Sequence, residues 1–241
     1  MDKINIVDSN EWGAAKAENI KKVLESVLDI FCDYWGPAVK WHDKTIDIKR
    51  VYGDRNPWCH REANTIYLNI EDEFWNQLAY QFAHEYCHYC IFRPIIQRFR
   101  WFEETLCELS SYFVLNQLSK RWETSPPDYT WGWYAPNFLS YALRDMQKAK
   151  QIATDTKEFH NKDLVFLEGH EYDRAINAGI AIRMLSIFER VPELWCTVPV
   201  ICSYNDETLD FCRFMKKWHD DVPAEFKDEI GKIAEIFAIR T

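Results

Sequence analysis

The sequence predicts an α+β protein with a small N-terminal sheet, followed by a mostly α-helical C-terminal lobe. Apolar and polar residues alternate in residues 45–51 and 63–70, as is typical of half-buried strands. Elsewhere apolar residues recur with the period of a helix, and the 241 residues include only 7 Gly and 9 Pro. We expect one domain over residues 1–241, with an α/β lobe in residues 1–95 and a helical lobe in residues 96–241.

The apolar period predicts a first helix over residues 12–35, ending at Gly36 and Pro37. The two strands come next, and we expect them to be neighbours in one sheet. A helix is then expected from Glu71 to about Phe92, because Pro94 stops it. Residues 120–137 are rich in Trp, Tyr and Pro and predict an irregular loop. Further helices are expected near residues 101–118, 137–153, 171–190, 206–219 and 224–239.

Charge and composition exclude several classes of partner. There are 29 Lys and Arg against 38 Asp and Glu, a net charge of -9, with no basic block, which argues against nucleic acid as a partner. No apolar run approaches the ~18 residues of a membrane span, and no apolar segment marks the N-terminus. We therefore expect a cytoplasmic protein that does not bind a membrane, with its eight cysteines reduced. The sequence predicts no oligomeric state.

Residues 84–88 read His84-Glu85-Tyr86-Cys87-His88, which is the HExxH pattern. Two histidines four residues apart share one face of a helix and can bind one Zn²⁺, while the intervening glutamate lies beside the metal. Gln77 and Gln81 extend the two histidines into a polar stripe on an otherwise apolar helix. The pattern predicts a zinc site on this helix.

A third zinc ligand is expected from the next helix. Glu104 and Glu108 are one turn apart, so one carboxylate can bind the metal while the other accepts a hydrogen bond from a ligand histidine. Glu103 points about 100° away from Glu104, and we expect it to be a solvated surface charge.

HExxH followed by W-F-E-E-T-L-C-E from Trp101 resembles the gluzincin clan of zinc metallopeptidases, which includes thermolysin and several aminopeptidases. The resemblance implies His84, His88 and Glu104 as zinc ligands, Glu85 as general base and Glu108 as a hydrogen-bonding partner of a ligand. Thr105 departs from the pattern, because many members have Gly or another small residue there.

A looser resemblance links Tyr172-Asp173-Arg174-Ala175 to the helix whose tyrosine stabilises the oxyanion in the aminopeptidase branch. It implies a catalytic role for Tyr172. By spacing, Tyr172 begins an apolar stripe in the first turn of a helix, where a phenol could point into a cleft. His170 is the alternative, since either side chain can donate a hydrogen bond to an oxyanion.

These features predict a zinc metallopeptidase with a peptide or protein substrate. The resemblance implies that the substrate pairs with an edge strand formed by residues 63–70. Glu62 could hold a free N-terminus, but the matching aminopeptidase strand is absent, so exopeptidase activity is not supported and the cleavage mode stays open. The alternative is a non-catalytic zinc-binding protein, whose site closes with a fourth ligand such as Cys87 or Cys107. Glu85 favours catalysis, because a structural site does not need it.

Overall fold

The computed structural model describes residues 3–8, 10–36, 44–152 and 161–241. They form two compact units, one of Met1–Cys90 and Ser110–Asp145 and the other of Ile91–Leu109 and Met146–Thr241. One long helix, α3 (Arg100–Thr124), belongs to both. The sequence did not predict that Ser110–Asp145 returns to the first unit.

The sheet of the first unit has four strands, β1 (Ile4–Ile6), β2 (Ile46–Arg50), β3 (Trp58–His60) and β4 (Thr65–Leu68). Their order is β1-β2-β4-β3, in which β1, β2 and β4 are parallel and β3 is antiparallel. The expected pairing of the two alternating segments is therefore confirmed. The expectation that residues 63–70 form an edge strand is wrong, because β3 pairs with β4 and takes that edge.

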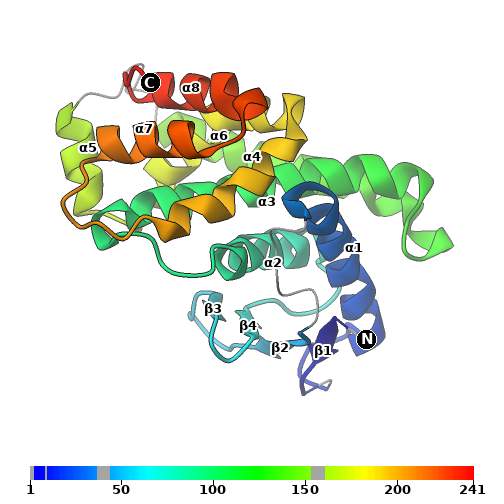
Figure 1. Ribbon diagram of the computed structural model, residues 1–241. Helices are drawn as coiled ribbons and strands as arrows, with labels where there is room; N and C mark the ends of the chain where they lie inside the picture. Colours follow the sequence, from blue (N-terminus) through cyan, green and yellow to red (C-terminus); the bar gives the residue numbers. More distant parts are fainter. Residues whose placement is uncertain (1–2, 9, 37–43, 153–160) are drawn as a thin grey trace. The chain divides into compact units, whose positions relative to one another are not determined.

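Two helices cover this sheet (Figure 1). The first, α1 (Ala17–Trp35), packs on β1, and α2 (Trp75–Cys90) packs on β3, β4 and α1. Both begin later than predicted, for one shared reason. Ala14 N donates to Asp72 Oδ1 at 2.8 Å, and Gly13 (φ 67°) and Asp72 (φ 60°) have backbone angles that a helix excludes. At its other end, α1 stops at Gly36 (φ 59°) as expected, while Pro37 lies outside the described residues.

The expected loop over residues 120–137 is mostly helical. Helix α3 continues to Thr124, a 3-10 helix, η3 (Tyr129–Tyr134), follows, and α4 (Ala135–Ile152) begins at once. The aromatic residues hold this segment to its surroundings. Trp131 stacks on both Trp75 and Trp122, and Tyr134 accepts a hydrogen bond from Asn76 N at 3.3 Å. The aromatic composition thus reflects packing, which Pro126 and Pro127 do not prevent.

The second unit is helical apart from its connections. It contains the 3-10 helix η2 (Gln97–Phe99), the start of α3, α5 (Asn161–Glu168), α6 (Arg174–Arg190), the 3-10 helix η4 (Pro192–Ser203), α7 (Phe211–Asp221), the 3-10 helix η5 (Ala224–Phe226) and α8 (Lys227–Ile236). Helices α5 and η4 were not predicted, and the predicted end at Ala153 lies outside the described residues. Phe211 packs against Trp101, Phe102 and Phe237, with ring centroids 4.8–5.3 Å apart. This aromatic core fixes the first turns of α3.

None of the helices in the described ranges combines the length and the apolar character that crossing a membrane requires. All eight cysteines fall within the described residues, and none of them forms a disulfide. Cys87, Cys90 and Cys107 are buried, whereas Cys212 is exposed. The other four cysteines are half-buried.

Glu229 on α8 offers a first testable prediction. Burial raises the pKa of Glu229, but hydrogen bonds from Lys232 (2.7 Å) and Arg190 (2.6 Å) outweigh this, and the pKa lies below its usual value. A lowered pKa in the folded state stabilises the fold above the unfolded pKa of about 4.3, and this stabilisation is lost at lower pH. Because both cations are half-exposed, we expect Glu229→Gln to lower the free energy of unfolding by only about 1 kcal/mol at pH 7.

Urea unfolding at several pH values checks this prediction. The difference between Glu229→Gln and the unmodified protein should shrink as the pH falls below about 4. Glu235→Gln, at an exposed position of the same helix, is the control. A difference that persists at pH 2 would show that the ion pairs are not its source.

Candidate metal centre

His84 and His88 lie one turn apart in the second half of α2. Their ring centroids are 5.2 Å apart at an interplanar angle of 66°, and both side chains are half-buried. Glu85, between them in the sequence, is buried, with 6% of its surface exposed. The spacing that the sequence predicts is thus realised on a helix, with the two imidazoles side by side.

The turn between β3 and β4 fixes the end of α2. Arg61 Nε donates to the carbonyl oxygen of His88 at 2.6 Å, and its Nη2 lies 3.5 Å from His88 Nδ1. Tyr89 donates its hydroxyl proton to Asn64 Oδ1 at 2.7 Å. One turn before His84, Gln81 exchanges two hydrogen bonds of 2.9 Å with the main chain of Asn69. The polar stripe therefore serves partly to attach α2 to the sheet.

Two serines of α3 bind the main chain of α2. Ser110 Oγ donates to Ala83 O at 3.3 Å, and Ser111 Oγ donates to Tyr80 O at 3.0 Å. The later serine, Ser111, bonds to the earlier residue of α2, Tyr80, so the two helices are antiparallel here. Cys107 lies one turn before both serines and shares their face of α3.

Cys107 completes a group that could hold a metal ion. One ligand atom from each of His84, His88 and Cys107 lies within 4.8 Å of the other two. Two imidazole nitrogens and a thiolate are donors that zinc accepts, with bonds of about 2.0–2.3 Å, so a small side-chain movement would bring all three to one ion. Within the described ranges, no carboxylate joins this group.

The glutamates of α3 differ in their surroundings. Glu104 and Glu108 are half-buried, one turn apart on one face, as expected. The expectation for Glu103 is wrong. Its side chain is buried, with 4% exposed, and its Oε2 accepts a hydrogen bond from Ile95 N at 3.2 Å. Helix α3 is covered on more than one side, so pointing away from Glu104 does not mean pointing to solvent.

A polar network holds the segment before α6 against the start of α3. Thr105 Oγ1 donates to Trp101 O at 2.9 Å and approaches Asn177 Oδ1 at 3.5 Å. Asn177 Nδ2 donates to Glu171 O, and Gln97 Nε2 donates to Glu171 Oε2, both at 3.0 Å. Thr105, the departure from the gluzincin pattern, thus contributes a hydroxyl group to this network.

Tyr172 lies in this segment, and its expected position in a helix is wrong. Helix α6 begins at Arg174, because Asp173 caps it by accepting a hydrogen bond from Ile176 N at 3.1 Å. Tyr172 therefore precedes the helix and is 64% exposed. Desolvation and the carboxylates of Glu171 and Glu104 raise the pKa of Tyr172, and a hydrogen bond from Arg100 opposes them. Tyr172 and Glu104 are thus close enough to interact.

His170 has a different environment. Its Nδ1 lies 2.8 Å from Phe166 O, and its ring stacks on that of Phe166 with centroids 3.9 Å apart. These contacts engage one ring nitrogen and fix the ring. Between the two oxyanion candidates, Tyr172 is the one whose surroundings include a predicted site residue.

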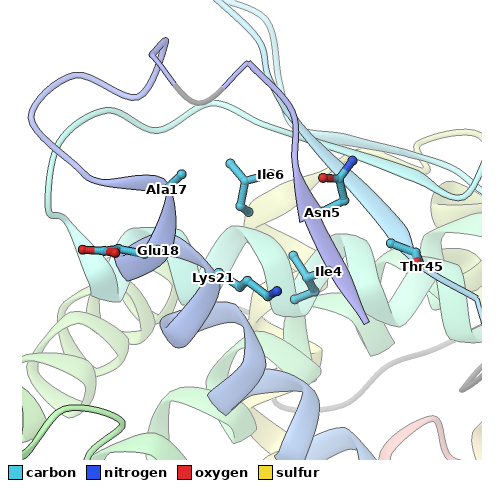
Figure 2. Close-up of a pocket in the computed structure, with 7 residues that line it drawn as sticks. All are labelled: Ile4, Asn5, Ile6, Ala17, Glu18, Lys21 and Thr45. Carbon is cyan, nitrogen blue, oxygen red and sulfur yellow. The ribbon is translucent and has the colours of Figure 1, made fainter. Parts of the chain in front are cut away.

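A pocket of about 400 Å³ lies between β1 and α1 (Figure 2). It is lined by Ile4, Asn5, Ile6, Ala17, Glu18, Lys21 and Thr45. The lining contains no histidine or cysteine and none of the predicted site residues. Its single carboxylate, from Glu18, does not make a metal site, and we assign the pocket no role.

Sequence reasoning named Cys107 only as a possible fourth ligand and missed Arg61 and Asn177. Cys107 follows Glu104 by three residues, so the helical period that selected Glu104 and Glu108 also placed Cys107 near their face. Arg61 and Asn177 carry no such signal, because their partners are distant in sequence. The chain matches no protein-family model, no curated protein and no solved structure, so its membership of the gluzincin clan stays a prediction.

Proposed function

We propose that this chain is a zinc-dependent peptidase whose general base is Glu85. One observation carries the proposal: Glu85 is buried on α2 between two histidines that share a metal-capable group with Cys107. A bound zinc ion would lower the pKa of a water molecule to about 7 and polarise the carbonyl of the substrate. The chemistry of the donor atoms supports zinc over Mg²⁺ or Ca²⁺, which prefer oxygen.

The residues of the chain would divide the remaining work. His84 and His88 hold the metal, and the third ligand comes from α3, where Glu104 and Cys107 are the candidates. Glu108, one turn beyond Glu104, is proposed to accept a hydrogen bond from a ligand histidine. Glu85 takes a proton as the substrate carbonyl is attacked and passes it to the leaving amine.

The sheet offers a way to bind an extended peptide. Strand β3 (Trp58–His60) lies at one end of the sheet, and within the described residues it pairs with β4 alone. It also packs against α2, which carries His84 and His88. A peptide added to the outer edge of β3 would extend the sheet by main-chain hydrogen bonds. The proposed substrate strand is therefore β3, with exposed Trp58 and His60 as its contacts.

A non-catalytic metal-binding protein is the second candidate. The observation that favours it is the buried thiol of Cys107, because structural zinc sites commonly include cysteine. In such a protein Glu85 would have no chemical task. Replacement of Glu85 therefore separates the two candidates.

Cleavage of a diverse peptide library, read by mass spectrometry, tests the proposed function. The zinc-loaded protein should cleave a subset of peptides, a chelator should abolish cleavage, and added Zn²⁺ should restore it. His84→Ala and His88→Ala should bind less zinc and lose cleavage together. If the zinc-loaded protein cleaves nothing, or if cleavage survives in the chelated protein and in both variants, the proposal is wrong.

A further inference from the structure

We propose that the thiolate of Cys107 is the third protein ligand of the metal, in place of Glu104. This inference concerns the site on which the proposed function rests. Its basis is the group of His84, His88 and Cys107, whose ligand atoms lie within 4.8 Å of one another. Donors around a tetrahedral zinc ion are about 3.5 Å apart, which follows from bond lengths of about 2.0–2.3 Å.

The position of Cys107 is fixed by its helix. Ser110 and Ser111, one turn further along α3, donate to the main chain of Ala83 and Tyr80 on α2. These bonds hold this part of α3 against α2, and Cys107 lies one turn before both serines on the same side of α3. Its thiol is fully buried.

Two other buried cysteines provide an internal comparison. Cys87 and Cys90 lie on α2 beside the histidines in sequence, and both are as buried as Cys107. Neither belongs to the metal-capable group. Burial alone therefore does not bring a thiol close to both histidines. Of these three buried cysteines, only Cys107 lies within reach of both.

Glu104 lies one turn before Cys107 on α3. Its carboxylate acts on the phenol of Tyr172, on which the Arg100 guanidinium also acts. Within the described residues, neither Glu104 nor any other carboxylate belongs to the group that contains both histidines. In this arrangement the charge of Glu104 acts on Tyr172, and Cys107 binds the metal.

A site with two imidazoles and one thiolate has chemical consequences. Binding exchanges the Cys107 S–H bond for an S–metal bond and releases one proton to solvent. The soft thiolate favours Zn²⁺, Co²⁺ and Cd²⁺ over Mg²⁺ and Ca²⁺. Three protein ligands leave the fourth position free for water or substrate, so the inference is compatible with catalysis.

Replacement of zinc by Co²⁺ tests the ligand directly, because a cobalt–thiolate bond gives a charge-transfer absorption in the near ultraviolet. The unmodified protein, Cys87→Ser and Glu104→Gln should all show this band. Cys107→Ser should lack this band. Its affinity for Co²⁺ should also fall by more than about 100-fold, because loss of an outer-sphere partner alone costs roughly 10- to 100-fold. Cys107→Asp should regain affinity without the band, which excludes misfolding as the cause.

The outcomes separate this inference from the proposed function. If Co²⁺ binds without the band, or if Cys107→Ser keeps it, Cys107 is not a ligand, while metal-dependent cleavage can still stand. If Glu104→Gln loses the metal and Cys107→Ser does not, Glu104 is the third ligand. If no Co²⁺ or Zn²⁺ binds to the unmodified protein, both the inference and the proposed function are wrong.

Discussion

Replacing Glu85 with Gln is expected to reduce peptide cleavage by at least about 10²- to 10⁴-fold, which is the usual contribution of a general base. Glutamine keeps the volume of the side chain and its ability to form hydrogen bonds, but it cannot take up the proton. Since Glu85 is buried, the isosteric change also avoids a cavity. The metal content should be unchanged, because His84 and His88 are retained.

Initial rates of library cleavage and elemental analysis of the same samples provide the measurement. Glu73→Gln, at an exposed position just before α2, is the matched control and should cleave at the unmodified rate. Urea unfolding of each variant shows whether the fold is intact. Cleavage by a folded, zinc-loaded Glu85→Gln protein at the unmodified rate would exclude Glu85 as the base and favour the non-catalytic alternative.

The strands show which parts of the fold local sequence can predict. β2 and β4 were predicted because each is long enough for apolar and polar residues to alternate visibly. β1 and β3 have three residues each, too few for a period, and their structure depends on pairing with β2 and β4. The edge of the sheet was assigned wrongly for this reason, since β3 was not recognised.

The same distinction holds for the candidate metal centre. The placement of His84 and His88 side by side was predictable, because four residues of helix determine it. The helical period places Cys107 near Glu104 and Glu108, but its approach to the two histidines follows from the contact of α3 with α2, to which the Ser110 and Ser111 hydroxyls contribute. The exposure of Glu103 was predicted wrongly, because the helical period shows to which side of α3 a side chain points but does not show which sides are buried by other parts of the protein.

The helix starts mark a third limit. The apolar period extends back to Tyr172, but helix α6 begins only after Asp173, whose carboxylate accepts a hydrogen bond from Ile176 N. Asp72 likewise delays the start of α2, because its backbone is in the left-handed region (φ 60°) just before the helix. In both cases a single acidic residue in a turn overrode an apolar pattern that extended past it.

Replacing Tyr172 with Phe is expected to lower kcat by about 10²- to 10³-fold, the usual effect of removing one donor to an oxyanion. The network of Thr105, Asn177 and Glu171 holds the segment of Tyr172 against α3, next to Glu104. Desolvation and two carboxylates raise the pKa of Tyr172, so the hydroxyl keeps its proton at neutral pH and can donate it in a hydrogen bond.

The change to Phe removes only the hydroxyl oxygen, so zinc content should stay the same and KM should change less than kcat. Tyr129→Phe, at a position that is 92% exposed, is the matched control and should cleave normally. His170→Ala tests the alternative donor. Its Nδ1 already lies within hydrogen-bonding distance of Phe166 O, so we expect a smaller loss than for Tyr172→Phe. Unchanged kcat in Tyr172→Phe, together with a 10²-fold or greater loss in His170→Ala, would transfer the oxyanion role from Tyr172 to His170.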